Sequence, residues 1–204
     1  MRNIFNKLPK KLLALGAIFA TSVVLSAAAV ATFGPDRPTR QWTAAETGFD
    51  YVTFNSFTGV PNGIGDERDF LRGVVTGRDA EWQDPVNSVA NNDTVTAKIY
   101  IHNNADSSLN DDEGQPGVAR DVNVKIDIPT ELDDDQEVLS TISASNAQPT
   151  AIFDTLDINS VNDSLFQLAY VPGSATLTNT GATLSDDIFT TGINLGDQYD
   201  CFDY

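Results

Sequence analysis

The feature that most constrains the fold is a strict alternation of apolar and polar residues at positions 121–128. Because successive side chains of a β-strand point to opposite faces, this pattern predicts a strand with one buried face and one solvated face. Pro129 should end the strand, because proline cannot donate a hydrogen bond to the next strand. We expect four residues to be buried, Val122, Val124, Ile126 and Ile128, and four not to be, Asp121, Asn123, Lys125 and Asp127.

The same period of two recurs at residues 94–102. Here one face carries Val95, Ala97, Ile99 and Ile101, and the other carries Thr96, Lys98, Tyr100 and His102. Weaker strand patterns, separated by turn sequences, occur at 52–57, 70–75, 138–143, 151–158, 165–171, 175–178 and 188–195. Short strands at this spacing favour an all-β sandwich or barrel over a fold that alternates strands and helices.

The first 33 residues have the layout of an export signal. Arg2, Lys7, Lys10 and Lys11 precede residues 12–33, which carry no charge, and Ala29-Val30-Ala31 offers a small-residue cleavage site. The segment is either a signal peptide cleaved after Ala31 or a retained membrane anchor, because one apolar helix of this length could span a bilayer. Either outcome places the remainder on the extracellular side of the envelope, secreted or N-terminally anchored, and leaves the basic flank in the cytoplasm.

The chain therefore divides into a signal or anchor (1–33), a Pro- and Arg-containing linker (34–50) and an acidic domain (51–204). Residues 32–204 hold 8 basic residues and all 29 acidic ones, a net charge of −21. Such a surface repels nucleic acid and anionic lipid, so we expect no nucleic-acid partner and membrane contact only through residues 12–33. The charge either keeps an exported domain soluble or attracts cations.

No catalytic motif emerges from the sequence, which predicts a protein that is not an enzyme. His102 is the sole histidine and is expected on the solvated face of a strand. The chain lacks a Gly-x-Ser-x-Gly nucleophile motif and a phosphate-binding glycine loop. One histidine and one cysteine, Cys201, make no zinc site.

Runs of acidic residues are the only chemically suggestive feature. Calcium prefers several hard oxygen ligands, and the candidate ligands are Asp66, Glu67 and Asp69, which follow a glycine turn. The alternative is a local ionic network of these acids with Arg68 or Arg72. The acidic run at 106–113 does not fit an EF-hand loop. Trp82 and Tyr100 could stack on a glycan, although packing in the core or an interface is the favoured interpretation of Trp82.

The last residues suggest that the sandwich is incomplete in this chain. Phe202 and Tyr204 would share a face of a strand that has only begun at Cys201. We expect either a fragment of a longer protein or a sheet that is completed by a strand from a partner. The unpaired Cys201 fits a truncated chain or an intermolecular disulfide.

Residues 93–104, followed by residues 118–132, resemble the domain of unknown function number eleven, a conserved-repeat module of bacterial and archaeal surface proteins. Asn103 matches the family's turn asparagine, and Ile128-Pro129 with Leu132 matches its closing segment, whereas an acidic insert (106–117) replaces the usual Asn-x-Gly turn. Five flanking segments are similar to exported proteins of ultrasmall, reduced-genome bacteria: 33–38, 52–56, 65–70, 170–175 and 184–188. The resemblance implies an immunoglobulin-like antiparallel β-sandwich in a cell-surface setting.

Together these observations predict a non-catalytic structural or adhesive module of the cell surface, without a required cofactor. Its partner would be the cell envelope or another surface protein. The alternative is a surface domain that binds calcium or a carbohydrate.

Overall fold

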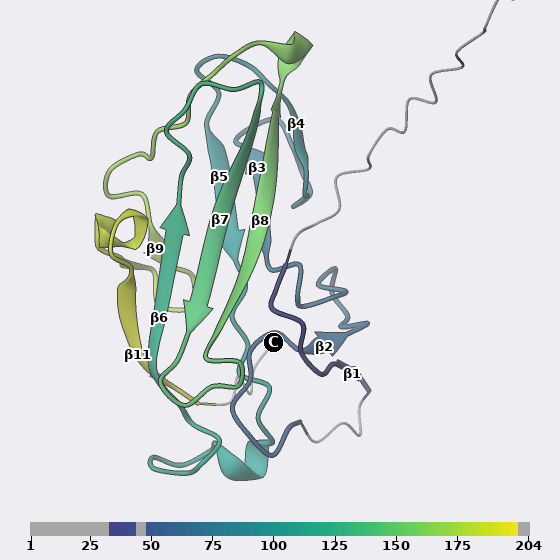
Figure 1. Ribbon diagram of the computed structural model, residues 1–204, viewed down its shortest axis with the longest axis vertical. Coiled ribbons are helices and arrows are strands. Elements are labelled where there is room, and N and C mark those ends of the chain that lie inside the picture. The colour runs from purple at the N-terminus through teal and green to yellow at the C-terminus, as the bar shows by residue number, and fades with distance from the viewer. Residues whose placement is uncertain (1–32, 44–47, 200–204) are drawn as a thin grey trace, which may run out of the picture.

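The computed structural model describes residues 33–43 and 48–199, which form a mostly β structure in two packed layers (Figure 1). One layer is a five-stranded sheet in the order β11-β6-β7-β8-β4, and the other is the two-stranded sheet β3-β5. Two further pairs, β1-β2 and β9-β10, lie outside these sheets. The strands are β1 (Arg40–Gln41), β2 (Phe57–Thr58), β3 (Leu71–Val75), β4 (Val86–Val89), β5 (Val95–Ile99), β6 (Ala119–Asp127), β7 (Asp135–Ser143), β8 (Ala151–Ser160), β9 (Thr176–Leu177), β10 (Ala182–Thr183) and β11 (Ile193–Gln198).

Helical structure in the described ranges is limited to three short 3-10 turns, η1 (Ser107–Leu109), η2 (Val161–Asp163) and η3 (Asp186–Phe189). None of the helices within these ranges is long and apolar enough to cross a membrane. The predicted signal or anchor, apart from Phe33, lies outside the described residues, as do Cys201–Tyr204, so the expectation of an incomplete C-terminal strand stays a prediction.

The predicted register of residues 121–128 is confirmed in β6. Val122, Val124 and Ile126 are buried, whereas Asp121 is exposed and the other polar positions are half-buried. Ile128 lies beyond the end of β6 and is only half-buried against the core. Pairing is antiparallel from β11 through β6 and β7 to β8, but β4 runs parallel to β8, which the prediction of a purely antiparallel sandwich missed.

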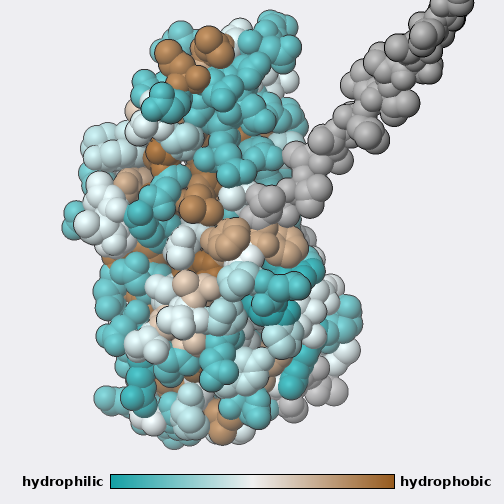
Figure 2. Space-filling model, in the orientation of Figure 1, coloured by the Kyte–Doolittle hydropathy of each residue, from teal (hydrophilic) through white to brown (hydrophobic). Residues whose placement is uncertain are grey.

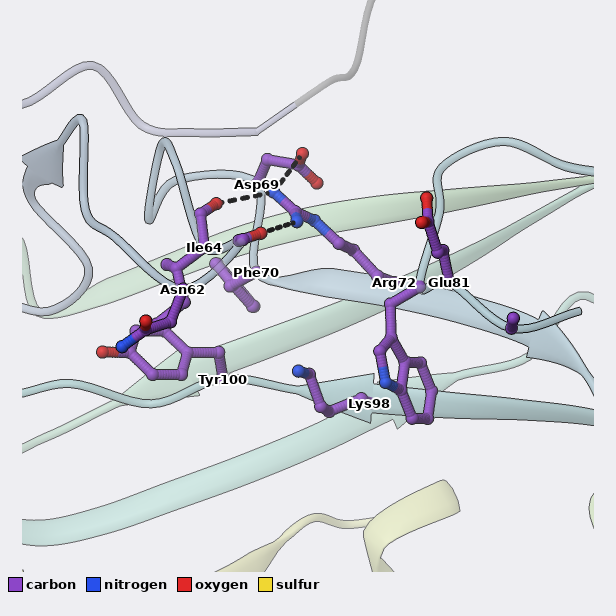
Figure 3. Close-up of a pocket in the computed structure, with 11 residues that line it drawn as sticks. Asn62, Ile64, Asp69, Phe70, Arg72, Glu81, Lys98 and Tyr100 are labelled. Atoms are coloured by element: carbon purple, nitrogen blue, oxygen red, sulfur yellow. Dashed lines mark hydrogen bonds and ion pairs between the residues drawn. The ribbon is translucent and has the colours of Figure 1, made fainter. Parts of the chain in front are cut away.

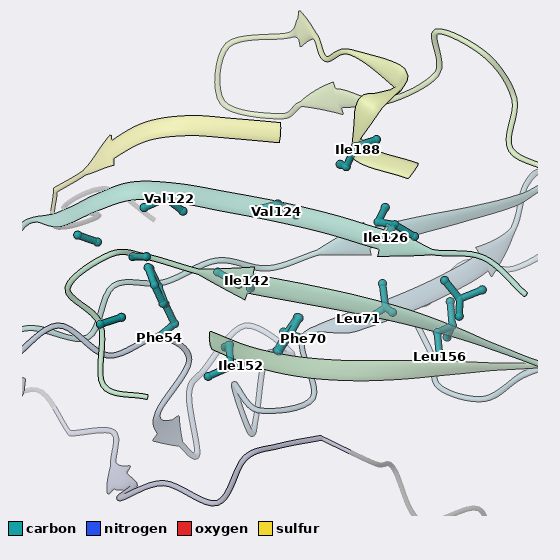
Figure 4. Close-up of a cluster of buried hydrophobic side chains, with 14 of the residues drawn as sticks. Phe54, Phe70, Leu71, Val122, Val124, Ile126, Ile142, Ile152, Leu156 and Ile188 are labelled. Carbon is teal, nitrogen blue, oxygen red and sulfur yellow. The ribbon is translucent and has the colours of Figure 1, made fainter. Parts of the chain in front are cut away.

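The hydrophobic core lies between the two layers (Figure 4). It combines side chains from the large sheet, such as Ile142, Ile152 and Leu156, with Leu71 from β3. The layers approach closely at Gly73 of β3, where an added Cβ atom would lie 2.8 Å from Val86 Cγ2 and 2.9 Å from Leu156 Cδ2. Glycine is therefore the residue that lets β3 pack against β4 and β8.

The weaker strand patterns correspond to strands to different extents, and segment 175–178 contains the short strand β9. β3, β7 and β8 fall within or around the expected segments. Segment 165–171 forms only an isolated bridge between Phe166 and Asp133, and segment 188–195 divides into the end of η3 and the start of β11. Gly192, with a φ of 84°, accounts for that division because it turns the chain between the two elements.

Described residues of the predicted linker (34–50), together with Phe33, contact the domain. Gly34 forms a bridge with Phe153 of β8, and β1 pairs in parallel with β2. The guanidinium of Arg68 lies over the Phe33 ring at 4.6 Å. The last residue of the apolar run thus contacts the folded domain.

Candidate functional site

The centre of the polar interior is Arg37, whose side chain is almost fully buried. Its Nε donates to the carbonyl oxygen of Phe54 and to Ser56 Oγ, each at 3.2 Å, and its Nη2 donates to the carbonyl oxygen of Asn55 at 2.9 Å. Burial lowers the pKa of Arg37 to about 10. The arginine satisfies carbonyl groups of a segment that the sequence predicted as a strand but that forms one only at its last residue, Phe57.

Glu67, one of the three proposed calcium ligands, is completely buried and turned inward. Its Oε1 lies 2.6 Å from His102 Nδ1, and its Oε2 accepts hydrogen bonds from the Phe57 backbone N–H at 3.0 Å and from Asn104 Nδ2 at 2.9 Å. The same Oε1 also accepts a hydrogen bond from the hydroxyl group of the half-buried Tyr100 at 3.4 Å. Glu67 therefore organises the packing around β2 and is not positioned with Asp66 and Asp69.

His102 is buried, which corrects the prediction that it lies on a solvated strand face. β5 ends at Ile99, and the residues after it leave the ladder. The His102 backbone N–H donates to Asn55 Oδ1 at 2.8 Å, and its ring packs against Phe57 at a centroid distance of 5.9 Å. The alternation of apolar and polar residues continues in the sequence beyond the end of β5. It therefore predicted a solvated His102, whereas the side chain is buried.

Asp66 and Asp69 each form an ion pair with a neighbouring arginine, as the alternative interpretation predicted. Asp66 pairs with Arg68 at 2.7 Å, and Asp69 pairs with Arg72 at 2.9 Å. Burial alone would raise the pKa of Asp66, but hydrogen bonds from Arg68 lower it overall. In the described part of the chain, no group of three or more His, Cys, Asp or Glu side chains is arranged to hold a metal ion.

The sequence reasoning missed two further acids, Asp154 between the layers and the half-buried Asp84 in the loop before β4. Asp154 of β8 is fully buried, and burial raises its pKa to about 7, although hydrogen bonds from the Leu71 and Phe70 N–H groups lower it. Burial likewise raises the pKa of Asp84 to about 6, with the negative charge of Asp157 adding to the effect. The only sequence signal for Asp154 is its place among the core-facing residues of β8.

A pocket of about 470 Å³ lies on the outward face of the β3-β5 sheet (Figure 3). Arg72 of β3 and Lys98 of β5 are direct partners across the sheet, and since Leu71, Gly73 and Val75 face the core, these two point outward. The loop before β4 adds Trp82 and Glu81, and the turn before β3 adds Asn62 and Ile64. Tyr100 follows β5 and closes the other side.

Trp82 and Tyr100, which the sequence singled out as possible stacking surfaces, thus share one pocket with Asp69. Trp82 is 39% exposed, and the Lys98 ammonium lies 5.2 Å from the centre of its ring. Sequence reasoning identified both aromatic residues and Asp69, and it named Arg72 only as a partner of the acidic run, but it missed Lys98. Arg72 and Lys98 lie side by side in the pocket because β3 pairs with β5, and the sequence alone does not show how these two strands align.

Comparison of the chain with protein-family models, with curated proteins and with solved structures gave no match in any of the three. The pocket and the buried network are therefore interpreted from their own geometry.

Proposed function

We propose that the protein is a non-catalytic structural or adhesive module on the extracellular side of the cell envelope, with an immunoglobulin-like sandwich as its folded domain. The supporting observation is the attachment of residues 33–43 to the domain through Arg37. Phe33, the last residue of the apolar run, contacts the domain, because the Arg68 guanidinium lies over its ring. The sandwich would be held close to the membrane, or its mature N-terminus would be fixed on its own surface.

The exterior fits an extracellular setting. Figure 2 shows hydrophilic residues over most of one face of the molecule, and the chain as a whole carries a formal net charge of −17. A highly charged exterior keeps domains soluble and discourages association between copies. The resemblance of residues 93–104 and 118–132 to a repeat module of surface proteins supports the same setting, with the envelope or another surface protein as partner.

Fractionation of expressing cells, followed by N-terminal sequencing of the surface form, tests the proposal. We expect the chain in the envelope or the medium. A sequence that starts at Thr32 would indicate cleavage after Ala31, and an intact Met1 would indicate a retained anchor. Recovery of the chain in the cytoplasmic fraction alone would contradict the proposal.

A further inference from the structure

The pocket on the outward face of β3-β5 combines aromatic rings with positively and negatively charged side chains. Trp82 and Tyr100 provide flat apolar surface, while Asn62 and Glu81 provide an amide and a carboxylate at the rim (Figure 3). Aromatic surface beside hydrogen-bonding side chains can position a ligand, because the rings supply contact area and the polar groups fix its orientation. Sugars suit such a site, because their C–H faces pack on aromatic rings and their hydroxyl groups bond to carboxylates and amides.

The charges within the pocket differ in how they are satisfied. The Arg72 guanidinium is held by Asp69 Oδ2 and by the carbonyl oxygens of Gly63 and Ile64, all at 2.9 Å. Lys98, by contrast, forms no ion pair within residues 33–43 and 48–199. Its ammonium group instead lies over the Trp82 ring. An ammonium group left without a carboxylate on such an acidic protein is available to an anionic ligand.

The position of Lys98 defines where the anion would bind. A carboxylate on its ammonium group would lie beside the Trp82 indole, and a ring attached to that carboxylate would extend toward the aromatic side chains. A hydrogen bond between the ammonium group and a carboxylate is stronger than one between the ammonium group and a neutral hydroxyl group. The two features together suit a molecule that has both a carboxylate and a polar ring.

We propose that this pocket binds a short saccharide that carries a carboxylate, such as a uronic acid oligomer, with the carboxylate on Lys98 and a sugar ring on Trp82. This inference rests on the proposed adhesive function, for which it names the class of ligand. Binding itself is a property of the purified chain, so it is measured separately from the location of the chain in the cell.

Tryptophan fluorescence of the full chain, carrying Trp42→Phe, tests the site with Trp82 as the sole tryptophan. Trp42 contacts Phe57 edge-on at 5.5 Å, so phenylalanine preserves an aromatic contact there. A detergent without a sugar headgroup keeps the chain in solution. The probes are trigalacturonic acid, the neutral trisaccharide maltotriose and the ring-free tricarballylate. We expect saturable binding of trigalacturonic acid that is at least about tenfold tighter than that of either other probe.

Lys98→Gln should weaken binding of trigalacturonic acid by at least about tenfold and leave maltotriose unchanged. The matched control is Lys125→Gln, which removes a lysine from β6 in the other sheet and should change neither. Equal binding of tricarballylate, unchanged affinity in Lys98→Gln, or no saturable binding of trigalacturonic acid would each overturn the proposal. Binding by a chain found only in the cytoplasm would refute the proposed function and retain the site.

Discussion

Asp154 Oδ2 accepts the backbone N–H of Leu71 at 2.7 Å, so a side chain of one layer fixes the start of a strand in the other. The same oxygen accepts the N–H of Phe70 at 2.5 Å. Asp154 occupies a core-facing position of β8 between Ile152 and Leu156, where an alternating strand would ordinarily place an apolar residue. On one edge of β3, the Asp154 carboxylate accepts the hydrogen bond that a neighbouring strand would otherwise accept. The opposite edge of β3 pairs with β5.

Stability should decrease with pH because of this carboxylate. The pKa of Asp154 is about 7 in the folded protein and has the ordinary value of 3.8 once unfolded. As pH rises, Asp154 therefore loses its proton in the unfolded state before it does so in the folded state. The stability that its raised pKa contributes is fully present below pH 3.8 and is lost by pH 7. The loss is about 4 kcal/mol at most. Urea unfolding at several pH values between 4 and 7 measures it.

The control is Asp154→Asn, which keeps an acceptor oxygen but cannot titrate. It should flatten the dependence of the unfolding free energy on pH in this window, and Asp84→Asn should remove a smaller part of it, since the Asp84 pKa is about 6. A slope in Asp154→Asn equal to that of the unchanged chain would show that Asp154 does not titrate there.

Adjacent acids should differ sharply in their contribution to stability. Glu67→Ala leaves the Phe57 N–H and Asn104 Nδ2 without their buried acceptor, at a cost of about 3 kcal/mol or more. Asp66→Ala removes a partly exposed ion pair and should cost about 1 kcal/mol or less. Chemical denaturation of the two variants side by side measures the difference. Equal losses would place Glu67 in an exposed setting and contradict the buried network.

The sequence predicted the centre of the fold better than its edges, for a physical reason. A long strand such as β6, covered on one face, must alternate, so its register can be read directly. Short strands carry too few residues for a period: β4 spans Val86–Val89, and only its ends are buried. Its parallel pairing with β8 depends on distant residues, and local sequence patterns do not record such pairings.

The candidate site was only partly predictable for a related reason. Acidic composition drew attention to Asp66, Glu67 and Asp69 together, but neighbours along an irregular segment point in different directions. Glu67 enters the interior, while its neighbours pair with arginines at the surface. The aromatic residues of the pocket were identifiable by type, whereas the partnership of Arg72 with Lys98 required the β3-β5 register.

Loss of Arg37 should release the N-terminal segment from the domain. In Arg37→Met, the carbonyl groups of Phe54 and Asn55 lose a charged donor, at a cost of roughly 3 kcal/mol. Hydrogen exchange should accelerate at the backbone amides of Arg40 and Trp42, which donate to Ser56 and Thr58. Arg120→Met, at an exposed position on β6, is the matched control. Unchanged exchange in Arg37→Met would mean that the segment is held by other contacts.

A methyl group at Gly73 should separate the two layers. Gly73→Ala places Cβ within 2.9 Å of Val86 and Leu156, and overpacking of this kind costs about 1 to 3 kcal/mol. The second change Val86→Ala removes one of the clashing groups, so the double variant should be less destabilised than the sum of the single variants. Thermal unfolding of the four proteins gives the coupling. Strict additivity would contradict the close approach of β3 to β4.

The most direct test of extracellular display is amine labelling of intact cells with a membrane-impermeant reagent. The chain has five lysines, Lys7, Lys10, Lys11, Lys98 and Lys125. The account predicts that Lys98 and Lys125 are modified without lysis, and that Lys7, Lys10 and Lys11, in chains that retain them, are modified only after lysis. Modification of Lys98 and Lys125 only after lysis would contradict it.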